Sequence, residues 1–507
     1  MNEVIINTGN YFNQESILYM MFAIPLIAAF VAIFIKSENL RDVSIIILGI
    51  SLFTNVISLA PLIQEGYFPT LSIAEISPSL KISFTLEWLG FLFAIVASFL
   101  WIITTIYSIG YMRTNKEKNH GRFYCFFALS IFSVMGIALS DNLLTLFLCY
   151  ELLTIFTFPL VAHEGDENAK KGAKTYLSIL IGTSMSFFLV AVIWVFNITG
   201  TLDFKSGGIL AGHASIFETG LLLLLFSYGI GKAALMPFHR WLPAAMVAPT
   251  PVSALLHAVA VVKAGVFSIV KIIVYIFGIE NLHNVIDSNW WGGGWLVVIS
   301  GTTIICASII ALRQDNLKKR LAFSTVSQLS YVIMAVALLA PQAVMAAGFH
   351  IAAHAIGKIT LFFAAGSIYT ASGKKYVSEL NGIGKRMPYT MAAFAIASLS
   401  MIGLPPTVGF LSKYYMLKGA FEYGNFFAIT VIIVSTLLNA AYFLPIIYAA
   451  FFKDEDKPAK GKKKDHGEAP LAIVISLSIT ALLVLILFVK PDLFIWLASE
   501  TSYSGSK

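Results

Sequence analysis

Ionisable side chains lie inside long apolar stretches of this 507-residue sequence, where charge is expensive. A lysine near the centre of a lipid bilayer costs ~2.5–3.5 kcal/mol even on insertion scales. Lysine, histidine and glutamate are the side chains best suited to hold and release protons. The residues concerned are Glu151, Lys232, His257, Lys263, Lys271, His350, His354, Lys358, Lys413 and Lys418.

The spacing of these residues indicates how some of them act together. His350, His354 and Lys358 follow one another at i, i+4 and i+8, so a helix would place them in one stripe. Glu151 and Lys232 are lone opposite charges in separate stretches. Pairing them would stabilise the lysine charge, and separating them would release its proton. We therefore interpret this pair as a switch on a proton carrier.

Structural interpretations compete with this one. A single lysine in a membrane can belong to an ion pair, and His239 and His257 can bridge helices. Lys271 and Lys418 lie nearer the ends of their stretches, so both are expected to extend toward the membrane interface. The remaining set predicts a proton pathway, with no catalytic, cofactor-binding or metal-ligating residue: Glu151, Lys232, His257, Lys263, His350, His354, Lys358 and Lys413.

Composition places these residues in an integral membrane protein. Hydrophobic residues make up 58% of the chain and charged residues 12%, with a mean hydropathy of +0.82. Soluble domains carry about 25% charged residues. The net charge of +7 lies in short loops, so it does not indicate a nucleic-acid partner. Cys125, Cys149 and Cys306 are isolated and read as buried hydrophobic residues.

About fourteen apolar runs are long enough to cross some 30 Å of hydrocarbon as helices. We therefore expect an all-α integral membrane fold. The runs are roughly 17–35, 43–62, 86–112, 122–139, 143–162, 173–199, 216–239, 250–278, 295–312, 317–339, 342–371, 390–422, 426–452 and 470–497.

Loop charges predict the orientation of these runs. The odd-numbered loops hold most lysines and arginines, including the run Lys460–Lys464. The even-numbered loops and the two tails hold only Lys81, Lys205, Lys490 and Lys507. The positive-inside rule then places the odd loops in the cytoplasm and both termini outside.

A weak internal repeat is also visible. Runs 7 and 12 are both interrupted by glycine and proline beside a lysine, Lys232 or Lys413, and they cross in opposite directions. This pattern is typical of inverted repeats with broken helices, here runs 4–8 and 9–13. The predicted regions are a three-helix part (1–121), two five-helix repeats (122–278 and 295–452), and a basic loop with the last helix (453–507).

Several motifs carry a family resemblance: K-A-A-L-M-P-F-H-R-W-L-P (232–243), A-P-T-P-V-S-A-L-L-H-A (248–258), L-K-K-R-L-A-F-S-T-V-S-Q-L-S-Y (317–331), H-A-I-G-K (354–358) and G-L-P-P-T-V-G-F-L-S-K (403–413). They resemble the antiporter-like subunits shared by respiratory complex I, Mrp-type cation/proton antiporters and membrane-bound hydrogenases. The length and Lys413 resemble the D-type Mrp subunit, whereas the 248–263 segment resembles the larger A-type sequences.

The resemblance implies a role for each matched position. Glu151 would modulate Lys232, Lys263 and His257 would form the centre, and Lys413 would be the terminal carrier. His350, His354 and Lys358 would relay between them. It also implies a bacterial or archaeal cytoplasmic membrane, no cofactor, other membrane subunits and lipids as partners, and Na⁺ or K⁺ only through those partners.

The leading functional hypothesis is a proton-translocating subunit of a multisubunit monovalent cation/proton antiporter. The alternatives are a proton-pumping subunit of a complex I-like or hydrogenase-like redox complex, a membrane partner in an energy-coupled uptake complex, and a self-contained solute transporter. A self-contained transporter would need a substrate pocket of mixed polarity, whereas here the deep ionisable residues form a string across several helices.

Overall fold

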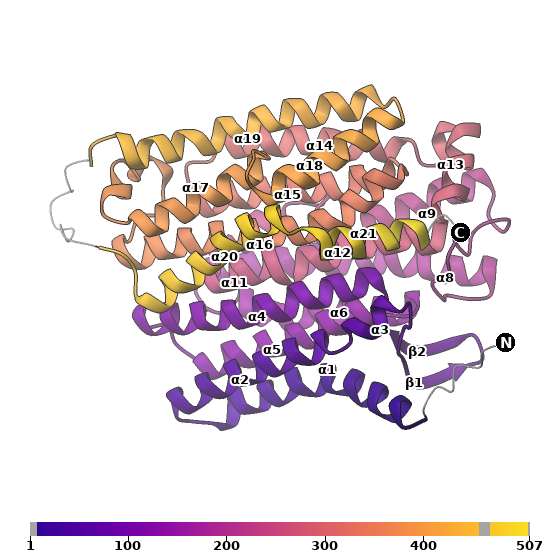
Figure 1. The fold of residues 1–507 in the computed structure, drawn as a ribbon, viewed down its shortest axis with the longest axis horizontal. Coiled ribbons are helices and arrows are strands. Elements are labelled where there is room, and N and C mark those ends of the chain that lie inside the picture. Colours follow the sequence, from indigo (N-terminus) through magenta and orange to yellow (C-terminus); the bar gives the residue numbers. More distant parts are fainter. Residues whose placement is uncertain (1–7, 456–466, 505–507) are drawn as a thin grey trace.

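The computed structural model describes residues 8–455 and 467–504, with side chains from residue 15 to residue 503 outside the gap. The predicted basic run Lys460–Lys464 lies outside the described residues, as does part of the predicted 453–507 region. Long helices run side by side through the molecule (Figure 1). The expected architecture of long membrane helices is confirmed.

Twelve helical segments of the described chain are long and apolar enough to cross a membrane. They fall on twelve of the predicted runs. Their main helices are α1 (Thr8–Phe34), α2 (Glu38–Ile57), α4 (Trp88–Thr114), α5 (His120–Leu139), α6 (Leu143–Val161), α7 (Glu167–Thr183) with α8 (Leu189–Thr199), α12 (Val261–Ile272), α14 (Trp295–Leu312), α15 (Leu317–Ala337), α16 (Pro341–Ser372), α19 (Phe426–Phe452) and α20 (Leu471–Val489).

The other two predicted runs, 7 and 12, contain shorter apolar helices and are interrupted. In run 7, α9 (Ile216–Gly229) gives way to the 3₁₀ turn η2 (Gly231–Ala233) and later to α10 (Trp241–Ala244). In run 12, α17 (Pro388–Ile402) ends at Gly403, whose φ is +91°, and the chain resumes as α18 (Val408–Glu422). The symmetry between two five-helix repeats, and the region boundaries, stay predictions.

Run 8 contains a break that sequence inspection missed. It divides into α11 (Thr250–Ala254), the π-helical turn η4 (Leu255–Val259), α12 and a second π turn η5 (Ile273–Phe277). Ala260 stands between η4 and α12 with φ −112° and ψ −80°, outside the helical region. This break separates His257 from Lys263. Run 14 is divided as well, because α20 is followed at Pro491 by α21 (Asp492–Ser504).

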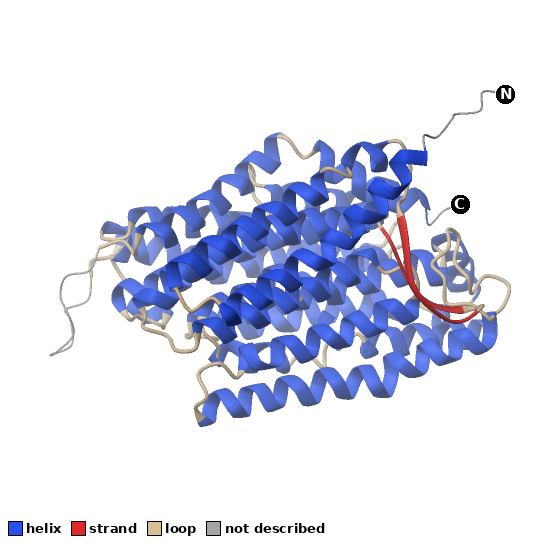
Figure 2. Ribbon diagram, turned by 90° about the horizontal axis from the view of Figure 1, so that it is seen from below, coloured by secondary structure: helices blue, strands red, loops and turns tan. Residues whose placement is uncertain are grey.

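A β-hairpin joins the second and third spans, where only a loop was expected. β1 (Thr70–Ser77) pairs antiparallel with β2 (Leu80–Thr85), and Thr70 lies opposite Thr85. Figures 1 and 2 place it at one end of the bundle. We call this end the hairpin face and the opposite end, with loops 115–119 and 373–387, the basic face. The short helices α3 (Ala60–Gln64) and α13 (Ile279–Ser288) also lie at the hairpin face.

Burial shows which helices are central. The apolar windows of Thr250–Phe277 and Pro341–Ser372 are 100% buried, whereas that of Glu38–Gln64 is only 28% buried. A helix that is apolar all round belongs in the interior or in lipid. Runs 8 and 11 are therefore enclosed by the rest of the bundle. Because they carry His257, Lys263 and the histidine stripe, the fold removes these side chains from solvent and lipid.

Candidate functional site

Lys413 is held at the break between α17 and α18. Its ammonium donates to the carbonyl oxygens of Met401 and Ile402, both at 2.9 Å. These carbonyls belong to the last turn of α17, which has no following turn to satisfy them. A cation at a helix C-terminus is also favoured by the helix dipole. The break therefore supplies a partner for a lysine that is only 5% exposed.

A neutral polar side chain connects this helix end to the histidine stripe. Gln328 on α15 donates to Met401 O at 3.4 Å, and its Oε1 lies 3.1 Å from Nε2 of His350. The other ring nitrogen of His350 lies 2.8 Å from Ser412 Oγ. His350 thus contacts the Lys413 region through two routes.

The stripe continues to the centre of the bundle. The rings of His350 and His354 are stacked, with centroids 5.8 Å apart and an angle of 6° between their planes. Nδ1 of His354 lies 2.5 Å from the ammonium nitrogen of Lys263 on α12. All three side chains are at most 1% exposed. The structure thus brings together Lys263, His354, His350 and Lys413, which we call the central line.

Lys358 and His257 form a side branch of this line. The Lys358 ammonium donates to Ser324 Oγ at 2.9 Å, and Nδ1 of His257 lies 3.1 Å from Oγ1 of Thr325. Ser324 and Thr325 are neighbours on α15, so this helix gathers the two residues. Lys358 therefore belongs to the same helix face as the histidines but turns toward α15 rather than toward Lys263.

Glu151 and Lys232 are neighbours, but the described chain shows no ion pair between them. The Lys232 ammonium donates to Tyr150 O and Thr154 Oγ1, both at 2.6 Å, and lies 3.1 Å from the centre of the Tyr150 ring. Neither carboxylate oxygen of Glu151 has a hydrogen-bond partner among the described residues. The hydrogen bonds of Lys232 are thus made to neighbours of Glu151 on α6 and not to Glu151 itself. This arrangement corresponds to the state of the predicted switch in which the two charges are separated. Nor is Lys232 hydrogen-bonded to the central line.

Lys418 is exposed, in agreement with its expected extension toward the interface, whereas Lys271 is buried. Lys271 is 1% exposed, and its ammonium lies 2.7 Å from Oε1 of Glu87, the residue that precedes α4. The chain reverses at the β2–α4 junction and thereby delivers a carboxylate to a lysine that the sequence leaves without a partner. The Lys418 side chain is 46% exposed, and its ammonium nitrogen lies 3.9 Å from Oε1 of Glu422.

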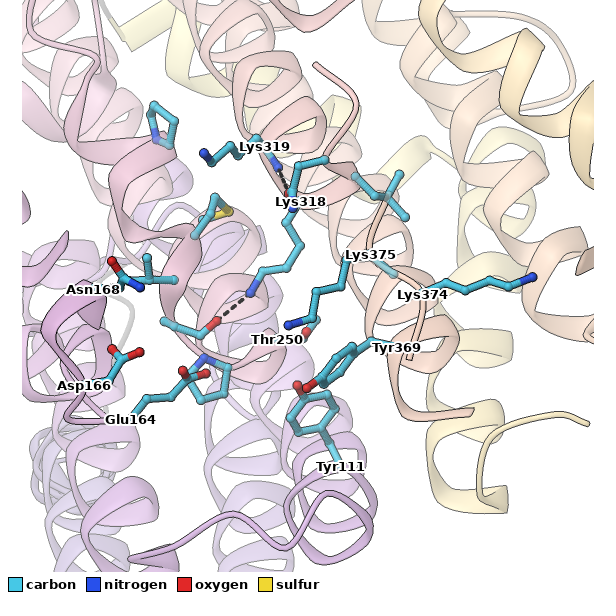
Figure 3. A pocket seen from close by; sticks show the side chains of 18 of the residues that line it. Tyr111, Glu164, Asp166, Asn168, Thr250, Lys318, Lys319, Tyr369, Lys374 and Lys375 are labelled. Atoms are coloured by element: carbon cyan, nitrogen blue, oxygen red, sulfur yellow. Dashed lines mark hydrogen bonds between the residues drawn. The ribbon is translucent and has the colours of Figure 1, made fainter. Parts of the chain in front are cut away.

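A polar pocket opens on the basic face (Figure 3). Its volume is about 350 Å³, and Glu117, Glu164, Thr250 and Lys318 are among its lining residues. The Lys318 ammonium donates to Ala248 O at 2.5 Å, just before α11. Burial raises the pKa of Glu164, a loop residue between α6 and α7, and Lys318 partly opposes that effect. The pocket thus holds carboxyl groups that bind protons more readily than exposed ones.

Sequence reasoning missed the neutral members of the site. Gln328, Ser412, Ser324, Thr325 and Thr154 contact the predicted ionisable residues. A signal was present for four of them, since Gln328, Ser324 and Thr325 lie in the 317–331 motif and Ser412 lies in the 403–413 motif. The carbonyl of Met401 has no signature of its own, but it follows from the Gly-Leu-Pro-Pro interruption that ends α17.

The fold and the buried charges define a polytopic membrane protein with an internal row of ionisable side chains. Residues 140–439, more than half of the chain, match the family Proton_antipo_M, described as NADH:quinone oxidoreductase/Mrp antiporter, TM. The chain belongs to this family of antiporter-like membrane subunits.

Individual relatives point to the same family. The chain is 30% identical over 405 residues to an NADH-quinone oxidoreductase subunit N of Desulforudis audaxviator, covering 78% of this chain and 79% of that one. It is 33% identical to the A/B subunit of a probable K(+)/H(+) antiporter of Rhizobium meliloti and 32% identical to the A1 subunit of a Na(+)/H(+) antiporter of Staphylococcus aureus. Each match covers 80% of this chain but only 40% and 52%, respectively, of those longer proteins.

Two solved structures share the fold. A chain of the Mrp complex from Dietzia sp. DQ12-45-1b aligns with a TM-score of 0.84 and 22% identity, and one of an archaeal membrane-bound sulfane sulfur reductase with 0.84 and 24%. Both alignments cover 97% of this chain and 98% of the other. These relatives come from multisubunit membrane complexes.

Proposed function

We propose that this chain is the proton-translocating subunit of a multisubunit monovalent cation/proton antiporter. The observation that carries the proposal is the central line, in which contacts run from Lys263 through His354, His350 and Gln328 to the carbonyl that holds Lys413. These side chains are buried, so protons pass between them and are not exchanged with solvent along the way.

The pathway has a second part at the first helix break. Glu151 and Lys232 form a switch whose separated arrangement leaves the lysine on Tyr150 O and Thr154 Oγ1. Water is required between this part and the central line, and broken helices favour internal hydration because their free backbone groups need partners. The polar pocket supplies an approach from the basic face, since Thr250 in its lining precedes His257 by two helical turns.

The remaining components follow from the same proposal. The chain sits in a bacterial or archaeal cytoplasmic membrane with its basic face in the cytoplasm and both termini outside, as the loop charges predict. It works beside other membrane subunits, which move Na⁺ or K⁺. Among the described residues no group of three or more His, Cys, Asp or Glu side chains fits a metal ion.

The test is proton flux in liposomes containing the full chain with its co-purifying subunits. Lys232→Ala and Lys413→Ala are each expected to lower proton flux at least about tenfold, because a positioned proton carrier is lost. Lys418→Ala is the matched control, since the side chain of that lysine is 46% exposed. The proposal is wrong if both variants keep proton flux while cation flux falls.

A second candidate is a proton-pumping subunit of a redox-driven complex. It is favoured by the NADH-quinone oxidoreductase subunit N, whose match covers 78% of this chain and 79% of that one, and by the fold shared with the sulfane sulfur reductase. Identification of the co-purifying subunits distinguishes the two. Small multi-span partners alone support the antiporter, whereas flavin- or iron–sulfur-containing partners support the redox complex.

A further inference from the structure

Lys271 and Glu87 form a buried ion pair that the predicted pathway does not use. The Lys271 ammonium lies 2.7 Å from Glu87 Oε1, donates to Ser140 O at 2.6 Å, and lies 4.6 Å from the centre of the Phe204 ring. Taking two charges out of water costs several kcal/mol per ion before their attraction is counted. The side chains of Lys271 and Glu87 are only 1% and 15% exposed, so this largely enclosed pair calls for an explanation.

The carboxylate is oriented toward the lysine rather than toward its own helix. Glu87 is the N-cap residue of α4, but its side chain makes no capping hydrogen bond. The N-cap side chains of Asn142 and Asp166, in contrast, accept from their own helices α6 and α7. The Glu87 side chain thus does not accept a hydrogen bond from the first backbone N–H groups of α4, as polar N-cap side chains usually do.

The pair borders a cavity at the hairpin face. This cavity has a volume of about 190 Å³, and Lys271, Glu87, Asp141 and Ser206 are among its lining residues. Lys81 lies 3.7 Å from Asp141 at the same end of the molecule, with its side chain 39% exposed. The buried pair is therefore adjacent to a polar space that leads away from the bundle centre.

The opposite side of the pair faces the central line. Lys271 follows Lys263 by eight residues on α12, a rise of about 12 Å. The ring of Phe267 stands between them, with its centre 5.7 Å from the Lys271 ammonium. Phe267 packs on Phe93 at 5.0 Å between ring centres, and both are fully buried. An apolar constriction of this kind blocks a path by excluding water.

We propose that Lys271 and Glu87 are the proton-release station of the central line toward the hairpin face, and that Phe267 and Phe93 are the barrier between this station and Lys263. The proposal rests on the proposed function, since it needs protons to arrive at Lys263. It adds an outlet at the opposite end of α12 from the break at Ala260.

The transfer balances as follows. An ammonium N–H bond of Lys271 breaks and the proton forms an O–H bond with Glu87, leaving a neutral amine and a neutral carboxyl group. The carboxyl group then gives its proton to water in the cavity and becomes a carboxylate again. When the aromatic barrier admits water, that water carries a proton from the Lys263 ammonium to the Lys271 amine, which restores the ion pair.

A purely structural ion pair makes a different prediction, and a double variant distinguishes the two. In Glu87→Leu/Lys271→Met, apolar side chains of similar size replace both charges, a change that often leaves stability unaltered or improved. For the complex in liposomes we expect an unchanged thermal midpoint but a fall in proton flux of at least about tenfold, because no titratable group remains. Wild-type flux in this double variant would overturn the release station.

The single variant Glu87→Gln adds a matched comparison. It is expected to lower flux as far as the double variant does. Asp42→Asn is its control, because Asp42 is also buried and ion-paired, with Arg113, but lies on α2 outside the pathway. Equal flux losses for Glu87→Gln and Asp42→Asn would also count against the station, since they would reflect general destabilisation.

The barrier has its own test. Phe267→Ala is expected to raise the passive proton leak of the reconstituted complex. Phe53→Ala is the control: it removes one ring of another aromatic pair, Phe53 and Phe99, whose ring centres lie 5.5 Å apart, and it is expected to leave the leak unchanged. An unchanged leak for Phe267→Ala would overturn the barrier. Lys413→Ala in the same preparation distinguishes the failures. If Lys413→Ala retains proton flux, the proposed function is wrong. If Lys413→Ala loses proton flux while Glu87→Leu/Lys271→Met keeps it, only the release station is wrong.

Discussion

The Lys263 ammonium nitrogen lies 2.5 Å from Nδ1 of His354, between two helices whose apolar windows are fully buried. An ammonium has no lone pair, so it can only donate to this nitrogen, and the nitrogen accepts only when it carries no proton. Two adjacent cations without water between them would repel strongly. The two residues therefore share one proton and act as a unit.

The shared proton predicts non-additive variants. Lys263→Met, His354→Phe and the double variant should each lower proton flux by the same factor, about a hundredfold, because each removes the same transfer. Flux is measured with a pH-sensitive dye in liposomes containing the full complex. Losses that multiply in the double variant would mean that the two residues act in separate steps.

Gln328 is expected to be required although it cannot titrate. Gln328→Leu keeps the volume but breaks both the contact to His350 and the hydrogen bond to Met401 O, so proton flux should fall about tenfold. Gln314→Leu is the matched control, since the Gln314 side chain donates to Ile310 O at its own helix end, and its contact with Arg320 is made by the backbone carbonyl, which the variant keeps. Equal flux in the two variants would show that protons pass from His350 through Ser412 alone.

The close approach of α12 to the first helix break depends on Gly265. A Cβ at this position would lie 2.4 Å from the backbone of Lys232 and Ala233. Gly265→Ala should therefore cost about 1–3 kcal/mol through overpacking and displace Lys232. A lower thermal midpoint and reduced proton flux are the expected readouts. Gly182→Ala is the control, because nothing lies within 4 Å of its added Cβ.

His163, just beyond the end of α6, predicts a pH dependence of stability. Its burial, together with the nearby Arg122, lowers its pKa from 6.5 to about 4. A group whose pKa is lower in the folded state destabilises the fold as pH falls from its unfolded pKa to its folded one. The thermal midpoint should therefore decline between pH 6.5 and about pH 4, and less steeply in His163→Phe. Parallel curves for the two proteins would contradict this assignment.

The sequence predicts the elements of the site better than their contacts. Glycine and proline at 403–406 mark the break that holds Lys413, because these residues interrupt helices wherever they occur together. The break at Ala260 has no such marker, since it lies among alanine and valine and arises only from packing. The partner of Lys271 was equally hidden, because Glu87 precedes a different helix.

Neutral polar residues set a further limit. Serine, threonine and glutamine are common in any chain. Although Ser412 and Thr325 lie in the quoted motifs, nothing in the sequence shows that they contact histidines on other helices. Their importance follows from which helices meet, and that is a tertiary property. The β-hairpin was missed for a related reason, because the alternation of apolar and polar residues along β1 is incomplete.

The end of α17 has a consequence for which ions the molecule can carry. Lys413 is balanced by two backbone carbonyls and not by a carboxylate, and the central line beyond it consists of amine, imidazole and amide groups. Na⁺ and K⁺ move through a protein where several oxygen ligands replace their hydration shell. A proton needs no shell, since it is passed on by exchanging one N–H or O–H bond for the next. Under the proposed function, the helix break thus makes the central line selective for protons over Na⁺ and K⁺.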